Sequence, residues 1–220
     1  MTYHLNFASL LPYWQVLASG LLFTIVLTLA STLVGVAVGT AGASARTFGP
    51  AWLGAIVRVY VELIRNTPFL VQLFFIFFGL PALGLKLSET TAAFLAMVIN
   101  LGAYSTEIIR AGIEAVPKGH LEAGTSLAMS NWEVLRYIVL RQALAKIWPA
   151  LSSQVIIVML GSAVVSQISA PDLTYAANFI QSRNFRAFEV YFVSTLLYLL
   201  LAIAARALLR VVGQRYFSVR

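Results

Sequence analysis

The chain has 220 residues, of which 60% are hydrophobic and only 10% are charged, and its formal net charge is +7. Soluble domains usually carry about 25% charged residues, so this composition excludes an ordinary water-soluble domain and favours an all-α integral membrane protein. The chain contains no cysteine, which excludes a disulfide framework and a thiolate metal site. Its basic residues flank apolar runs, a pattern that sets membrane orientation and is not typical of a nucleic-acid-binding domain.

Five apolar segments are long enough to cross a bilayer, for which a helix needs about 20 residues. In chain order we expect these spans at Gly20–Gly42, Val57–Leu80, Thr91–Arg110, Trp148–Ser169 and Ala187–Leu209. Pro68 is expected to kink the second span, because proline removes a backbone donor and clashes with the preceding turn. The chain would then divide into a periplasmic N-terminal segment, a transmembrane domain and a cytoplasmic tail, at residues 1–19, 20–210 and 211–220.

Lysine and arginine are unevenly divided between the two sides of these five spans. With the N-terminus outside, twelve of the 15 basic residues fall on the cytoplasmic side, and only Lys86, Arg183 and Arg186 stay outside. Cytoplasmic loops of membrane proteins carry the excess of basic residues. We therefore expect a periplasmic N-terminus and a cytoplasmic C-terminus, with one long cytoplasmic connection at residues 112–146.

The connection at 112–146 has the pattern of two short helices joined by a turn. Pro117 suits a first helical turn, and residues 117–128 are expected to form the first helix. Ser130 and Glu133 have the spacing of a capping box, which predicts a second helix from Asn131 to about Lys146. Its apolar stripe, at spacings of three and four, consists of Trp132, Leu135, Val139, Ala143 and Ile147. Such a hairpin suits either a groove on another protein or the membrane surface.

Polar side chains within the spans mark candidate sites, because such groups are costly in lipid and tend to face the bundle interior or a cavity. Arg58, Glu62 and Arg65 are spaced i, i+4 and i+7, which predicts an ion-pair ladder that either supports the structure or acts as a gate. Glu107 and Arg110 predict a second pair. Candidates for a translocation path, or for interhelical hydrogen bonds, are Asn100, Tyr104, Ser162, Ser166 and Gln167.

The hairpin segment contains a motif of fixed spacing: Glu122-Ala123-Gly124, then Ala128, Ile138 and Leu140-Arg141. Its spacing is that of the EAA signature of ABC permeases. Together with the motifs given below, it resembles the permease subunits of polar amino acid ABC importers, the histidine, glutamate and glutamine permease-like family. Gly124, Ala128 and Arg141 depart from its Ala, Gly and Pro, and Arg141 indicates that the second helix continues without a break. The similarity covers about residues 18–215 and includes Tyr60–Pro68, Leu70–Phe75, Phe78–Pro81, Gly102–Tyr104, Glu107–Arg110, Pro117–Gly119 and Pro171–Thr174.

The resemblance implies a five-span permease of the ABC importer type in the bacterial inner membrane, with a cytoplasmic coupling-helix hairpin. The implied coupling residues are Glu122, Ala123, Gly124, Ala128 and Ser130. They would contact a cytoplasmic ATPase dimer, which binds ATP and Mg, so no cofactor, metal or catalytic residue is expected in this chain. A periplasmic amino-acid-binding protein would deliver the substrate. The chain lacks the phosphate-binding loop of an ATPase.

The resemblance also implies a second permease subunit. Many relatives carry lysine and aspartate in the middle of the fourth span, and here Leu160–Val164 has neither. This departure favours a heterodimer whose sister permease holds the main site, although a homodimer also fits. An ABC permease for another solute, such as an opine, is the alternative function. A stand-alone secondary carrier fits less well, because carriers often show internal repeats, and a membrane enzyme lacks support from any catalytic constellation.

Overall fold

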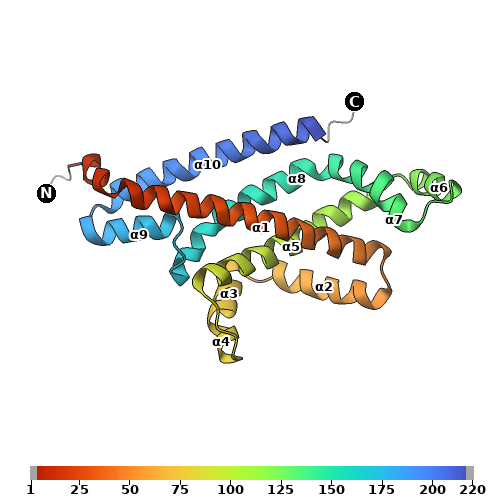
Figure 1. Ribbon diagram of the computed structural model, residues 1–220, viewed down its shortest axis with the longest axis horizontal. Coiled ribbons are helices and arrows are strands. Elements are labelled where there is room, and N and C mark those ends of the chain that lie inside the picture. The colour runs from red at the N-terminus through yellow and green to blue at the C-terminus, as the bar shows by residue number, and fades with distance from the viewer. Residues whose placement is uncertain (1–3, 217–220) are drawn as a thin grey trace. The chain divides into compact units, whose positions relative to one another are not determined.

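A computed structural model describes residues 4–216, and every regular element in that range is a helix (Figure 1). The α-helices are α1 (Trp14–Phe48), α2 (Ala51–Arg65), α3 (Phe69–Phe74), α4 (Leu80–Ala82), α5 (Glu89–Glu114), α6 (Lys118–Ser126), α7 (Asn131–Glu133), α8 (Leu140–Gly161), α9 (Leu173–Asn184) and α10 (Ala187–Tyr216). Two 3₁₀-helical segments, Phe7–Tyr13 and Ser162–Ile168, and two π-helical segments, Phe75–Gly79 and Val134–Val139, complete the list.

Four helical stretches among the described residues are long and apolar enough to cross a membrane, at 7–48, 89–114, 142–168 and 187–216. A fifth span results if α2 and the helical segment at 69–82 count as one broken span. The predicted all-α membrane fold is therefore confirmed, but the second span breaks where a kink was expected. Asn66 caps the end of α2 by donating its side-chain amide to the Glu62 carbonyl at 2.8 Å. The next residue, Thr67, precedes Pro68, and a residue before proline avoids the helical region.

The described chain consists of two compact units, and α1, α5, α8 and α10 each contribute a segment to both. Of the described residues, unit 1 comprises 4–31, 69–97 and 156–205, and unit 2 comprises 32–68, 98–155 and 206–216. Within residues 4–216, Lys86, Arg183 and Arg186 are the basic residues of unit 1, and the other eleven belong to unit 2. The two units thus separate the basic residues in the same way as the predicted sides of the membrane.

In unit 2, α1 packs closely on α5 because small residues line the contact. A Cβ atom on Gly35 would lie 3.0 Å from the Leu101 side chain, and one on Gly42 would lie 2.6 Å from the Thr106 hydroxyl. Tyr60 of α2 donates its hydroxyl to the Ile99 carbonyl of α5 at 2.6 Å. Unit 2 also contains an apolar core, made of Ala43, Ile109, Ile113, Val116, Val134, Val139, Ala143 and Ile147.

In unit 1, α9 was not predicted and packs with α10 and the start of α1 (Figure 1). Asp172 caps α9 by accepting a hydrogen bond from the Tyr175 N–H at 2.8 Å, and its other oxygen accepts from the Tyr198 hydroxyl at 3.0 Å. Leu173 N–H donates to Thr24 of α1 at 3.1 Å. The signal for this helix was present in the sequence, because a capping aspartate precedes apolar residues spaced i, i+3, i+4 and i+7, which are Leu173, Ala176, Ala177 and Ile180.

The Asp172 carboxyl is fully buried, and no ion pair with it is found among the described residues. Burial raises its pKa to about 6, and the hydrogen bonds from Tyr175, Tyr198 and Thr174 act in the opposite direction. Because the pKa of this acid is higher in the fold than in the unfolded chain, its contribution to stability is present at low pH. That contribution is lost as the pH rises through about 6.

We therefore expect the unfolding temperature of the purified protein in detergent to fall between pH 5 and pH 8. Asp172→Asn keeps a helix-capping side chain but removes the ionisation. The variant should be more stable than the natural chain at pH 8 by on the order of 2–3 kcal/mol, at 1.36 kcal/mol per pKa unit, and nearly equal to it at pH 4. If the unfolding temperatures of the two proteins changed with pH in the same way, the raised pKa of Asp172 would be contradicted.

Candidate functional site

The connection at 112–146 folds as the predicted helical hairpin, but its second helix does not end near Lys146 and continues through α8 to Gly161. Pro117 stands at the N-cap of α6, so this helix begins at Lys118, one residue later than expected, and ends at Ser126, two residues earlier than expected. The capping box is present: the Glu133 carboxylate accepts from the Ser130 N–H at 2.8 Å, and the Glu133 N–H donates to the Ser130 hydroxyl at 3.4 Å. The backbone hydrogen bond from Ser130 lowers the pKa of Glu133. These contacts fix the point at which the second half of the hairpin begins.

The predicted apolar stripe of the second helix is partly wrong. Val139, Ala143 and Ile147 are buried as expected, but Trp132 is 64% exposed, and the side chain of Leu135 lies outside the described residues. The reason is the π-helical segment Val134–Val139, in which hydrogen bonds run i to i+5. This wider turn brings Val134, five residues before Val139, onto the buried face and turns Trp132 outward.

The turn between α6 and α7 contains a residue in an unfavourable conformation. Ala128 has φ 54°, in the left-handed region that costs an L-residue other than glycine roughly 1–2 kcal/mol. This is the position at which the EAA signature has glycine. Alanine at this position therefore adds backbone strain at the tip of the hairpin.

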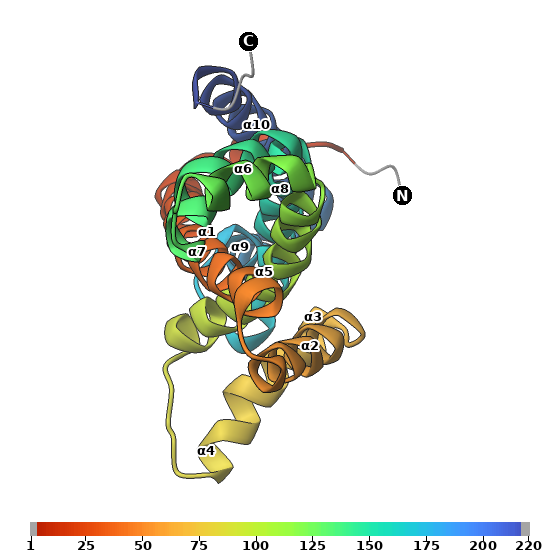
Figure 2. The same cartoon turned by 90° about the vertical axis from the view of Figure 1, so that its right-hand side faces the viewer.

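The base of the hairpin is fixed to α5 and α8 (Figure 2). Lys146 of α8 donates to the Ala115 carbonyl at 2.6 Å, and the His120 ring contacts the Gln142 amide oxygen at 2.8 Å. Gly124, the third residue of the signature, is buried, and a Cβ there would lie 2.8 Å from the Ile138 side chain. The hairpin is therefore packed onto the ends of two long helices and does not hang from a flexible loop.

The tip of the hairpin presents apolar and acidic groups to the outside. Leu127 is 75% exposed, Trp132 is 64% exposed, and Glu122 and Ala123 are exposed as well. Among the described side chains, Glu122 has no ion-pair partner. A rigid projection with large exposed apolar side chains is typical of a docking element, because a soluble surface rarely exposes such groups together.

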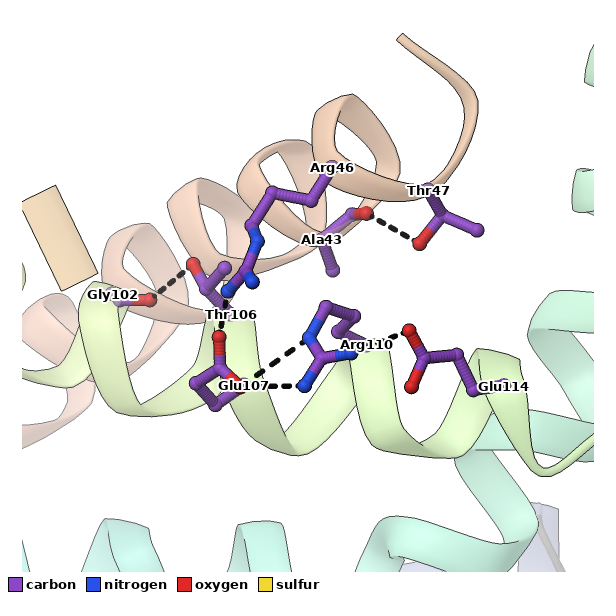
Figure 3. A network of polar contacts seen from close by, with 8 residues as sticks. All are labelled: Ala43, Arg46, Thr47, Gly102, Thr106, Glu107, Arg110 and Glu114. Carbon is purple, nitrogen blue, oxygen red and sulfur yellow. Dashed lines mark hydrogen bonds and ion pairs between the residues drawn. The ribbon is translucent and has the colours of Figure 1, made fainter. Parts of the chain in front are cut away.

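A polar network joins α1 to α5 in unit 2 (Figure 3). Arg46 of α1 forms an ion pair with Glu107, which also accepts from the Arg110 guanidinium at 2.9 Å. Arg110 continues the chain of charges to Glu114. The pair of Glu107 and Arg110 follows from their spacing, whereas Arg46 gives no local signal because it is 61 residues away from Glu107.

The predicted ladder of Arg58, Glu62 and Arg65 is not formed, since no ion pair joins these side chains in the described part of the chain. The Arg65 guanidinium lies over the Tyr104 ring instead, at 5.4 Å from its centroid, and all three charged side chains line a cavity. Helical spacing allowed the ladder, but the neighbouring α5 offers Arg65 an aromatic face.

The candidates for a translocation path fall in both units. In unit 2, Asn100 is buried and Tyr104 is half-buried beneath Arg65. In unit 1, the hydroxyls of Ser162 and Ser166 donate to carbonyls three residues earlier, and Gln167 is exposed. Both hydroxyls therefore already donate a hydrogen bond within their own helical turn. The five candidates are thus divided between the two units.

Comparison with known proteins decides the family. The family of the binding-protein-dependent transport system inner membrane component matches residues 32–218. The chain belongs to this family. The hairpin, the long apolar helices and the EAA-like spacing described above are thus those of an inner-membrane permease.

Two curated relatives and two solved structures illustrate this permease's similarity. The chain is 32% identical over 212 residues to the glutamine transport system permease protein GlnP of Escherichia coli (strain K12), covering 96% of this chain and 97% of that protein. It is 38% identical over 172 residues to the L-cystine transport system permease protein TcyB of Bacillus subtilis (strain 168), covering 78% and 74%. A crystal structure of an amino acid ABC transporter with histidines matches with a TM-score of 0.87 at 37% identity, covering 97% of this chain and 100% of the other. The MetNI methionine ABC transporter shares the fold, with a TM-score of 0.73 at 20% identity and coverage of 92% and 98%.

The strain at Ala128 predicts that Ala128→Gly stabilises the permease by about 1 kcal/mol, because glycine adopts positive φ at little cost. Ala123→Gly is the matched control: it lies within α6, where glycine should destabilise by about 1 kcal/mol. Hydrogen exchange of the hairpin amides measures both. Slower exchange in the first variant and faster exchange in the second is expected, and the same direction in both would contradict the strain.

The network predicts unequal effects for two glutamates of α5. Glu107→Gln leaves Arg46 and Arg110 without a shared carboxylate in a half-buried setting, which should cost about 2 kcal/mol, within the range for hydrogen bonds to charged groups. Glu114→Gln should change stability by less than about 0.5 kcal/mol, because exposed ion pairs contribute little and Glu114 is 56% exposed. Denaturant unfolding in detergent tests the difference, and equal losses would show that the network does not centre on Glu107.

Proposed function

We propose that this permease is the transmembrane subunit of an ATP-driven importer of polar amino acids. The observation that carries the proposal is the rigid hairpin with its exposed tip in a chain of this family. The glutamine and L-cystine permeases among its relatives, and the structure of an amino acid transporter at 37% identity, support the solute class. A permease for another small solute, such as an opine, is the alternative.

In the proposed mechanism, a cytoplasmic ATPase dimer holds ATP and Mg, and the nucleotide chemistry takes place there. Leu127 and Trp132 supply exposed apolar anchors for a groove on that partner, in the manner of a helix docked in a groove. Glu122 is free to meet a cation of the same partner through a charge-assisted contact. Because the hairpin base is packed on α5 and α8, displacement of the tip moves the ends of both helices.

The proposed orientation places unit 2 on the cytoplasmic side of the inner membrane, with the N-terminus in the periplasm and the C-terminus in the cytoplasm. Eleven of the fourteen basic residues within 4–216 belong to unit 2. Since cytoplasmic segments carry the excess of Lys and Arg, this distribution supports the orientation. A periplasmic binding protein would then deliver the amino acid at the opposite side.

A second permease subunit completes the proposed assembly. α2 presents an apolar stripe of exposed side chains, Trp52, Ile56, Val59 and Leu63, which suits either lipid or a neighbouring subunit. The fourth span lacks the lysine and aspartate of many relatives, and this supports a heterodimer in which the sister subunit supplies these charges. A homodimer remains the simpler assembly, and the mass of the purified native complex separates the two.

Uptake of labelled glutamine by the complete transporter in proteoliposomes tests the proposal. Uptake should require ATP inside and should persist when ion gradients are collapsed, which separates this function from a secondary carrier. Ala128→Trp should abolish uptake, because the larger side chain fills the docking turn. Leu85→Trp is the control at an exposed position of unit 1 and should transport normally. Full uptake by Ala128→Trp, or uptake without ATP, would contradict coupling through the hairpin.

A further inference from the structure

Unit 2 contains an open cavity of about 380 Å³ between α2 and α5, within the range of roughly 300–1,000 Å³ typical of ligand pockets. Its walls carry far more charge than the rest of the chain. The residues that matter are Arg58, Glu62, Arg65 and Asn66 from α2 and its end, and Tyr104 and Glu107 from α5. The cavity therefore offers both signs of charge within one small volume.

The charges in this cavity are not all balanced by one another. Glu107 is already shared by Arg46, which also reaches the cavity, and by Arg110. Among the described side chains, no ion pair is found for the other charged groups of the wall, Arg58, Glu62 and Arg65. Two guanidinium groups and one carboxylate are thus available to a ligand, which is a net surplus of one positive charge.

We propose that this cavity binds the ammonium and carboxylate groups of a neutral or acidic α-amino acid on the cytoplasmic side of the translocation route. Arg58 and Arg65 take the carboxylate, since guanidinium groups bind carboxylates in a planar, two-point geometry. Glu62 takes the ammonium group. This inference rests on the proposed function and narrows its substrate class.

The surplus of positive charge sets the selectivity of the site. A zwitterion such as glutamine pairs with both kinds of wall group, and the second negative charge of glutamate balances the surplus positive charge of Arg58 and Arg65. A cationic amino acid such as lysine brings a second positive charge into a cavity with only one free carboxylate. Because such charges are only partly screened in a recess, lysine is disfavoured.

The Arg65 guanidinium is held in place for this role. It lies 5.4 Å from the centre of the Tyr104 ring, and cations over aromatic faces are attracted by the ring quadrupole. This contact orients the group without neutralising it, whereas an ion pair with Glu62 would have occupied it. The stacking thus leaves the donors of Arg65 available at the cavity wall.

Direct binding to the assembled transporter in lipid nanodiscs, without binding protein or nucleotide, tests the inference. The probes are labelled glutamine, glutamate and lysine, and 4-carbamoylbutanoate, which is glutamine without its ammonium group. We expect glutamine and glutamate to bind at least tenfold more tightly than lysine. Arg65→Gln should weaken glutamine at least tenfold, and Arg210→Gln, an exposed arginine outside the cavity, should not.

The deamino probe assigns the two halves of the site. Glu62→Gln should weaken glutamine at least tenfold and leave 4-carbamoylbutanoate unchanged, while Arg65→Gln should weaken both. Equal binding of lysine and glutamine, or unchanged glutamine binding by Arg65→Gln, would overturn the inference. So would a loss of the second permease subunit from the Arg58→Gln and Arg65→Gln complexes, because these groups would then serve assembly. Absent binding in a transporter that still imports glutamine overturns this site alone, whereas absent uptake overturns the proposed function.

Discussion

The apolar contact between the hairpin and the ends of α5 and α8 is the interaction on which the account depends. Val134 and Val139 from the π-helical segment meet Ile109 and Ile113 of α5 in one buried cluster. Burying a side chain of this size contributes about 1.5–3 kcal/mol. The free energy of burying this cluster therefore exceeds the conformational entropy that a flexible connecting loop would keep. A force applied to the tip of the hairpin is transmitted to the ends of α5 and α8.

Among the charged side chains of unit 2 are two groups, those held in ion pairs and those that line a cavity. Glu107 binds Arg46 and Arg110 and ties α1 to α5, so these charges have a structural role. Arg58 and Arg65 of α2 face a cavity and are available for binding. The same end of unit 2 thus combines a fixed network, which keeps the helices together, with open charges that suit a polar solute on its way through an apolar protein.

Much of the fold could be predicted from the sequence, because a helix that crosses a lipid bilayer must be about 20 residues long and mostly apolar. The long spans, the hairpin and the capping box of Ser130 and Glu133 were all predicted and are present. Other features depend on packing between distant segments. The π-helical turn that moves Trp132 outward and the pairing of Arg46 with a residue 61 positions away have no local signal. The helix capped by Asp172 did have a local sequence signal. It was missed because Pro171 was interpreted as part of a short loop.

The central claim is that the hairpin lies on the cytoplasmic side and transmits movement of the partner ATPase to the long helices. The accessibility of Ser130 at the hairpin turn tests it most directly. The chain contains no cysteine, so Ser130→Cys introduces a single thiol in this subunit, and Leu85→Cys provides one at an exposed position of unit 1. With a membrane-impermeant maleimide, Leu85→Cys should be labelled in spheroplasts, and Ser130→Cys only after the membrane is opened. Labelling of Ser130→Cys in sealed spheroplasts would place the hairpin outside the cell and contradict the account.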